Sequence, residues 1–162
     1  MFTDKHKETE KGGAENLKKQ EAEKSSGGFK CVGCGKEVAF SDDIGTKHRN
    51  HCPFCLSSKH VDRDFSGDRE SSCNGIMVPV AITFKKEGLD KYGKEKKGDV
   101  MIVHECASCG EISINRIAAD DDEGAVLSVF SSSKEMSDEK KKKIYDAGIK
   151  ILENDDEKKE LY

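Results

Sequence analysis

Six of the seven cysteines in this chain form Cys-x-x-Cys pairs, a spacing that suits them to hold a metal ion. The three pairs are Cys31/Cys34, Cys52/Cys55 and Cys106/Cys109. Two intervening residues allow a tight turn to direct both sulfurs at one ion, and two such pairs complete a tetrahedral thiolate shell around zinc. Residues 35–51 separate the first two pairs, a gap typical of zinc ribbons. We therefore predict that the first two pairs form one structural zinc site.

The third pair requires two further ligands. Cys73 is the remaining cysteine, and His60 lies between it and the second pair. We predict a second zinc site from the following residues: Cys73, Cys106, Cys109 and His60. His48, His51 and His104 are alternative ligands, although His51 could instead support the adjacent cysteine through a hydrogen bond, as metal ligands commonly require. Thiolate-rich sets of this kind also accept iron, so the choice between zinc and iron stays open.

Two other uses of paired cysteines fit the chain less well. A disulfide framework is typical of small secreted domains, whereas this chain has an odd number of cysteines and no hydrophobic signal core. A thioredoxin-like motif uses one reactive pair within a βαβ unit, not three pairs. No apolar run approaches the length of a membrane span, and free thiol pairs are typical of the cytoplasm. We therefore expect a cytoplasmic protein that does not bind membranes.

The composition predicts one domain with charged extensions. Of the 162 residues, 34% are hydrophobic and 37% are charged, and the ends of the chain hold few large apolar side chains. We expect a disordered charged tail over residues 1–28, a zinc-binding domain over 29–131, and a charged helix or tail over 132–162. The net charge is −4, and neither extension is a basic arm. Strong non-specific DNA binding is therefore not expected, and any contact with nucleic acid requires a local cationic patch.

The pattern of apolar residues predicts a small β-rich α+β fold, with zinc-ribbon-like knuckles, short antiparallel strands and a C-terminal helix. Alternating or continuous apolar runs predict strands at 37–40, 76–84, 100–106 and 112–117, so the third cysteine pair lies in the turn between the last two. Residues 85–97 are predicted to be a charged loop. A short helix is expected at 125–130, and a single terminal helix from Met136 to Glu160, capped by Ser137.

One segment resembles a known family. Residues 47–62 (KHRNHCPFCLSSKHVD) resemble the RNHCP-domain family, which takes its name from the Arg-Asn-His-Cys-Pro string. Similar blocks occur at residues 67–69, 73–79, 104–110 and 115–121, so the resemblance covers about residues 29–131. It implies a zinc-binding domain whose pattern includes all seven cysteines. The family has no established activity, so the resemblance leaves the function to be argued from the residues.

A set of cations and amides is our candidate for contact with structured RNA, on the ribosome or elsewhere. The set is Arg49, Asn50, Arg69, Asn115 and Arg116. The guanidinium fork suits phosphate, and side-chain amides suit the edges of bases. Acidic residues are interleaved with the arginines, so internal ion pairs are an equally good interpretation of the charges.

Two other functions remain as alternatives. A metal-assisted nuclease or hydrolase could use His51, Asn115, Asp120 and Asp121, because an imidazole, an amide and carboxylates are the parts of such a site. The same two acids are also explained by the start of a helix, where negative charge is favourable. A protein-interaction adaptor would need no chemistry at all. The sequence therefore favours a binding protein over an enzyme.

Overall fold

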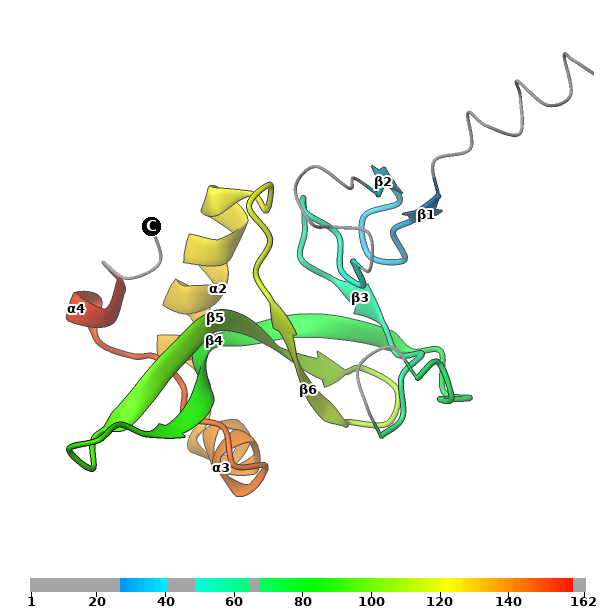
Figure 1. Ribbon diagram of the computed structural model, residues 1–162. Helices are drawn as coiled ribbons and strands as arrows, with labels where there is room; N and C mark the ends of the chain where they lie inside the picture. The colour runs from blue at the N-terminus through cyan, green and yellow to red at the C-terminus, as the bar shows by residue number, and fades with distance from the viewer. Residues whose placement is uncertain (1–26, 41–48, 65–67, 159–162) are drawn as a thin grey trace, which may run out of the picture.

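The computed structural model describes residues 27–40, 49–64 and 68–158 (Figure 1). Strands and helices follow one another along the chain as β1 (Gly28–Lys30), β2 (Glu37–Ala39), β3 (Ser58–Lys59), β4 (Ile76–Leu89), β5 (Glu95–Cys106), β6 (Ile112–Arg116), α2 (Glu123–Lys134), α3 (Asp138–Asp146) and α4 (Asp155–Lys158). Strands β1 and β2 form a small antiparallel sheet, and a four-stranded antiparallel sheet has the order β3-β4-β5-β6. These features confirm the predicted zinc-ribbon-like α+β class.

The four-stranded sheet is covered by a helix on each face (Figure 1). Successive strand residues point to opposite faces, so Ile82 and Ile102 face α2, while Ala81 and Val103 face α3. On the first face the buried cluster includes Val126 and Phe130 of α2, and on the second it includes Ile144 of α3. Two thin apolar layers therefore hold the sheet, in place of one large core.

The predicted loop at residues 85–97 is instead the outer half of the β4–β5 hairpin. Strand β4 continues to Leu89, β5 begins at Glu95, and Asp90 closes the turn by accepting hydrogen bonds from the Tyr92 and Lys94 N–H groups. Both faces of this part of the hairpin are mostly exposed, so its sequence lacks the apolar alternation that marks a half-buried strand. The prediction was wrong because main-chain pairing, which the pattern does not reveal, extends these strands.

The predicted single terminal helix is interrupted. Ser137 caps α3 as expected, accepting a hydrogen bond from the Lys140 N–H group. The helix ends at Asp146, and Gly148 then adopts a left-handed φ of 81°. After it the chain is not helical until Asp155, and Leu152 is buried, with its N–H group donating to the Ile82 carbonyl. Burial against the sheet outweighs the helix propensity of this charged segment.

Several predictions concern the outer parts of the chain. The predicted N-terminal tail lies, as far as residue 26, outside the described residues, and the predicted domain boundaries stay predictions. The short helix predicted at 125–130 is confirmed as part of α2.

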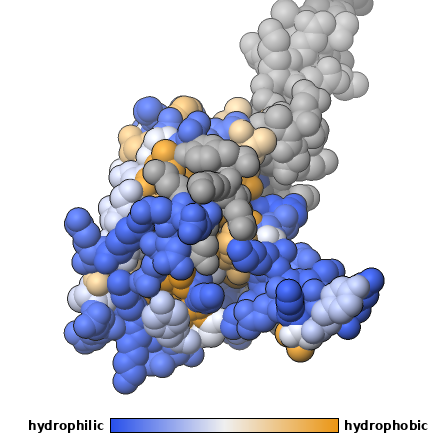
Figure 2. All heavy atoms as spheres, turned by 90° about the vertical axis from the view of Figure 1, so that its left-hand side faces the viewer, coloured by the Kyte–Doolittle hydropathy of each residue, from blue (hydrophilic) through white to orange (hydrophobic). Residues whose placement is uncertain are grey.

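Hydrophilic side chains dominate the face that Figure 2 presents. In the part of the chain that the structure describes, no helix is long and apolar enough to cross a membrane.

Candidate metal centres

The three cysteine knuckles share one backbone geometry. In each, the carbonyl of the first cysteine accepts a hydrogen bond from the N–H group four residues later, at 3.0, 2.8 and 2.9 Å in chain order. The donors are Gly35, Leu56 and Gly110, whose φ angles are 73°, 61° and 77°. A residue in this left-handed conformation reverses the chain tightly, which directs both sulfurs of a pair to the same side.

The first predicted site is assembled by the first two knuckles. Cys31 Sγ lies 3.5 Å from Cys55 Sγ, and Cys34 Sγ lies 3.6 Å from Cys52 Sγ. All four sulfurs lie within 4.8 Å of one another. With a zinc–sulfur distance of about 2.3 Å, the edge of a tetrahedral thiolate shell is about 3.8 Å. The spacing and the donor set therefore fit one four-coordinate zinc ion.

Electrostatics at the first site call for a bound cation. Burial raises the pKa of the Cys52 thiol to about 12, despite hydrogen bonds from the Cys55 and Phe54 N–H groups. Burial also acts to raise the pKa of Cys55, but hydrogen bonds from the Ser57 backbone and hydroxyl lower it to about 7. A metal ion bound among these sulfurs would displace the protons of the less acidic thiols as well as the more acidic ones.

The second predicted site is assembled by His60 with the remaining three cysteines. Cys73 Sγ lies 3.7 Å from Cys106 Sγ, His60 Nδ1 lies 3.4 Å from Cys109 Sγ, and all four ligand atoms are within 4.8 Å of one another. The other ring nitrogen of His60 lies 3.3 Å from the Glu111 carboxylate. Metal-binding histidines commonly donate to such a carboxylate, which fixes the ring and its tautomer. Sequence reasoning missed Glu111, although its position two residues after Cys109 was a usable signal.

The β3–β4 connection brings the second set together. The His60 N–H group donates to the Gly75 carbonyl at 2.8 Å, and the Asn74 N–H group donates to the His60 carbonyl at 3.0 Å. A Cβ at Gly75 would lie 2.8 Å from Cys106 Sγ, so only glycine fits beside that sulfur. Burial acts to raise the pKa of Cys106, but hydrogen bonds from the Cys109 and Ser108 N–H groups lower it to about 6. This thiol is therefore prepared to bind metal near neutral pH.

A third group of possible ligands is exposed and has a simpler role. Asp64, Asp68 and Glu70 lie close together in the loop before Cys73. The Asp68 carboxylate accepts hydrogen bonds from the Arg63, Asp64 and Glu70 N–H groups. These bonds account for the cluster as the support of its own loop.

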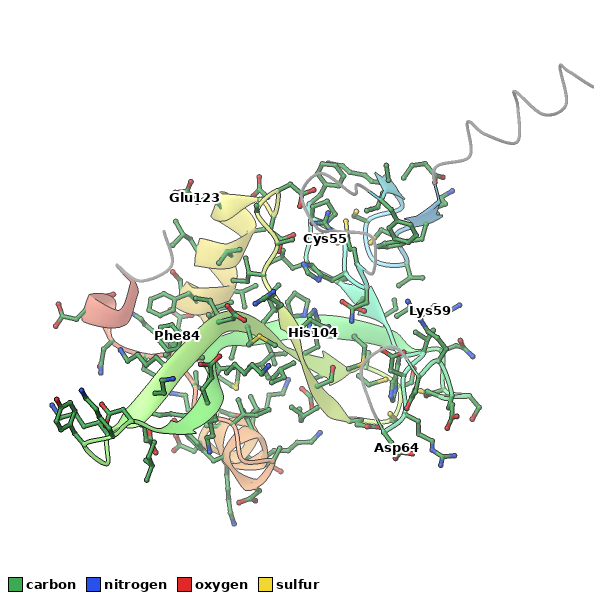
Figure 3. All side chains as sticks on the ribbon, in the orientation of Figure 1. Cys55, Lys59, Asp64, Phe84, His104 and Glu123 are labelled. Carbon is green, nitrogen blue, oxygen red and sulfur yellow. The ribbon has the colours of Figure 1, made fainter. Side chains whose placement is uncertain are left out.

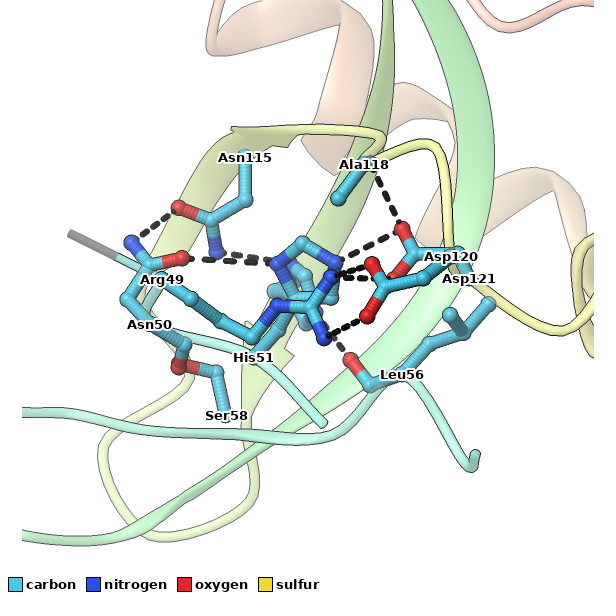
Figure 4. Close-up of polar contacts among 10 residues, drawn as sticks. Arg49, Asn50, His51, Leu56, Ser58, Asn115, Ala118, Asp120 and Asp121 are labelled. Carbon is cyan, nitrogen blue, oxygen red and sulfur yellow. Dashed lines mark hydrogen bonds and ion pairs between the residues drawn. The ribbon is translucent and has the colours of Figure 1, made fainter. Parts of the chain in front are cut away.

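A network of polar side chains, most of them buried, lies between the first site and the sheet, and we call it the polar joint (Figure 4). Its members are Arg49, Asn50, His51, His104, Asn115, Asp120 and Asp121. Arg49 makes two hydrogen bonds to the Asp120 carboxylate, one of them at 2.9 Å, and its guanidinium also lies 3.4 Å from Asp121. His51 Nε2 lies 2.8 Å from the same Asp121 carboxylate. Figure 3 shows His104 on the sheet, with Cys55 above it.

The Leu56 carbonyl, which can only accept a hydrogen bond, sets donor and acceptor along the chain of bonds from His104 to His51. His104 Nε2 donates to the Leu56 carbonyl at 2.7 Å, and burial lowers the pKa of His104 to about 4, so the ring is neutral and its Nδ1 accepts. Asn115 therefore donates to that Nδ1, at 3.1 Å, and its oxygen accepts from Asn50 at 2.6 Å. The oxygen of Asn50 then faces His51 Nδ1 at 3.5 Å. Both ring nitrogens of His51 consequently face oxygen acceptors.

A profile of the RNHCP domain matches residues 26–127 of this chain. The chain belongs to the RNHCP-domain family. No curated protein and no solved structure matches it. The matched range includes all eight predicted metal ligands and the whole polar joint. The string that names the family therefore spans two structures, since Arg49 to His51 belong to the polar joint and Cys52 and Pro53 belong to the second knuckle.

In this RNHCP domain the polar joint ties the first metal centre to α2. The Asp122 side chain caps α2, and its N–H group donates to the Pro53 carbonyl in the second knuckle at 2.8 Å. Asp121 accepts from the Ala118 N–H group at 2.9 Å as well as from His51 and Arg49, and its side chain is 1% exposed. The two acids are therefore occupied by internal partners.

The internal partners of these two acids do not favour the hydrolase alternative. His51, Asn115, Asp120 and Asp121 do lie together, as that alternative requires. Yet none of the ligand groups found among the described residues includes any of them. His51 and His104 are likewise absent from both metal sets, and His48 lies outside the described residues.

The candidate RNA contacts divide into two groups. Arg49 and Asn115 are buried in the polar joint, and Arg116 is exposed but paired with Asp99. Arg69 is also exposed, with its guanidinium 3.8 Å from Asp62. Arg49, Asn50 and Arg69 nevertheless line one hollow beside β3, and Arg116 is not among the residues that line it. The structure thus brings three of the five candidates together.

Proposed function

We propose that this RNHCP domain uses two structural zinc ions to hold a rigid surface that binds unpaired segments of structured RNA. The metal ions substitute for a large hydrophobic core, because their binding contributes directly to the free energy of folding. Neither site leaves an open coordination position once its four ligands are in place, which favours a structural over a catalytic role.

The observation that carries this proposal is the charge of the hollow beside β3, which we call the cationic hollow. Its volume is about 270 Å³, and it is bordered by the β1–β2 sheet and by β3. Three exposed cations line it, Lys30, Lys59 and Arg69, and the buried Arg49, whose charge is already paired with Asp120 and Asp121, also borders it. No acidic residue is among the described residues that line it, although the chain as a whole has a net charge of −4. Such local excess of positive charge attracts phosphate.

Aromatic rings in the same hollow favour RNA over a simple anion. Phe29 and Phe40 both line it, with their ring centroids 6.0 Å apart, and both are partly exposed. Unpaired bases stack on such rings while cations contact the adjoining phosphates, the common mode of single-strand recognition. Asn50 and Ser58 also line the hollow, but the Asn50 amide bonds to Asn115 and the Ser58 hydroxyl donates to the Asn50 carbonyl, so both are largely engaged within the protein.

Binding of an unpaired RNA oligonucleotide of about four nucleotides tests the proposal, because that length is enough to fill a small single-strand site. Lys59 is exposed and belongs to β3. We expect Lys59→Glu to weaken binding about tenfold and to reduce the salt dependence by roughly one phosphate contact. Lys142→Glu, which makes the same charge change on α3, is the control and should leave binding unchanged. Equal affinities of wild type and Lys59→Glu would contradict the proposal.

A further inference from the structure

The outer β4–β5 hairpin carries positive charge in an acidic chain. Between residues 85 and 97 there are six lysines against three acids, whereas the whole chain has a net charge of −4. The hairpin projects to one side of the body, away from the β1–β2 sheet (Figure 1). A net positive charge on a projecting element is the usual footprint of contact with a polyanion.

The register of the hairpin places like charges directly opposite each other. Lys86 pairs with Lys97 across the two strands. Like charges at such positions destabilise a sheet, so local stability does not explain this pair. Lys97 Nζ lies 5.1 Å from the centre of the Phe84 ring, which keeps its charge beside an apolar surface. Features that oppose local stability are expected where an element serves function.

A groove on the hairpin combines these lysines with apolar surface. It has a volume of about 290 Å³, and Phe84, Leu89 and Leu152 contribute its apolar side chains. Its charged lining consists of one acid, Glu95, and five lysines: Lys85, Lys86, Lys96, Lys97 and Lys150. At the tip, Leu89 is 65% exposed and Tyr92 is 75% exposed. A partner of this groove therefore needs both negative charge and flat or apolar groups.

We propose that the β4–β5 hairpin is a second RNA-contact surface, whose lysines bind backbone phosphates while Tyr92 stacks on a base. This inference rests on the proposed function, since it assigns a further contact to the same RNA. Nucleic acid fits this surface because it alternates charged phosphates with planar bases, which the lysines of the groove and Tyr92 at the neighbouring tip match.

The two surfaces lie at opposite ends of the sheet. Ser58, which lines the cationic hollow, pairs with Met77, and Met77 pairs with Cys106 at the end of β5. The hairpin tip is at the other end of that strand of 12 residues, about 40 Å away at the usual rise per residue. Figure 3 shows Lys59 near one end of the four-stranded sheet and Phe84 part-way along the hairpin toward its tip. An oligonucleotide of about four nucleotides is shorter than this separation even when extended and therefore reaches one surface, whereas a long RNA reaches both, which strengthens its binding.

The decisive variant is Lys86→Glu, because it turns the like-charged pair with Lys97 into an opposite pair. The melting temperature should stay the same or rise, so weaker binding cannot be attributed to unfolding. Binding is measured with two probes: the short unpaired oligonucleotide, and a stem-loop RNA longer than the distance between the surfaces. We expect Lys86→Glu to weaken stem-loop binding about fivefold and to lower its salt slope by about one unit, with no change for the short probe.

The controls separate this inference from the proposed function. Lys142→Glu should leave both probes unaffected, and Lys59→Glu should weaken both. Equal stem-loop binding by wild type and Lys86→Glu, with the effect of Lys59→Glu retained, would overturn the hairpin contact alone. If Lys59→Glu weakens the binding of neither RNA probe, the proposed function is overturned. Binding of the hairpin to anionic phospholipid vesicles, lost with Lys86→Glu while stem-loop binding is unchanged, would assign the groove to a membrane surface and also overturn the inference.

Discussion

Leu56 shows how one residue can serve both a metal knuckle and the hydrophobic core. The equivalent position in the other two knuckles is glycine, which adopts a positive φ without strain. At Leu56 the same conformation costs about 1–2 kcal/mol. Its side chain is fully buried with the α2 cluster, and such burial contributes roughly 2 kcal/mol or more. The hydrogen bond from His104 to its carbonyl further holds the turn.

His104 makes stability depend on pH. Burial lowers its pKa from an ordinary value of 6.5 to about 4 in the folded chain. Between these values the unfolded chain binds a proton that the folded chain does not, so stability falls as the pH drops through this window. At pH 5 the loss relative to pH 7 is about 2 kcal/mol. In urea titrations at the two pH values, His104→Gln should lose less stability on acidification than wild type, and equal losses would contradict this assignment.

Asp121 separates a structural role of the polar joint from a catalytic one. Asp121→Asn keeps the shape of the side chain but removes the charge that faces Arg49 and His51. Breaking such a buried pairing costs roughly 3 kcal/mol, so the midpoint of chemical denaturation should fall while the zinc content stays the same. Asp99→Asn, which removes an exposed partner of Arg116, is the control and should change stability by less than about 1 kcal/mol. A fully stable Asp121→Asn protein would favour the hydrolase alternative instead.

At the scale of elements, the turns of the first and third knuckles depend on a glycine with a positive φ. Gly35 has a φ of 73°, and a Cβ there would meet nothing within 4 Å, so substitution tests conformation alone. Gly35→Ala should destabilise the first site by about 1 kcal/mol and weaken its zinc affinity, measured by competition with a chelator. Gly35→Asn should recover part of this loss, because asparagine tolerates the left-handed region better than alanine. Equal affinities of Gly35→Ala and wild type would show that the turn adopts another conformation.

The elements that could be predicted are those whose residues carry a local signal. Cys-x-x-Cys spacing indicated both ligand sets, and apolar runs indicated the inner parts of β4 and β5. The outer hairpin lacks that signal because most of its residues are exposed on both faces. The end of the helix near Gly148 depends on a tertiary contact, the burial of Leu152 against the sheet. The polar joint was anticipated only in part: the hydrolase alternative grouped four of its members, but no local signal links Arg49 to Asp120, which is 71 residues away. Tertiary contacts, not propensity, decide these features.

At the scale of the whole molecule, the two metal centres lie in regions that differ in how much apolar packing stabilises them. The β1–β2 sheet has strands of three residues, and its buried cluster consists of Cys31, Val38 and Cys52. We expect that so small a cluster does not fold without the metal. The four-stranded sheet instead has an apolar layer on each face. The first centre should therefore determine whether its own sheet exists, and the second should mainly order the connection that carries His60 and Cys73.

Removal of one ligand from each centre tests this division. Cys34 and Cys109 are the exposed ligands of the two sets, so serine at either position disturbs the packing least. Cys34→Ser should reduce the zinc content from two ions to one and abolish amide protection in β1 and β2, while β4 and β5 stay protected, because their apolar layers are intact. Cys109→Ser should also leave one ion, with protection lost around residues 60–75 instead. Elemental analysis and hydrogen exchange measure both outcomes. Loss of both ions from either variant would mean that the polar joint couples the two centres into one folding unit.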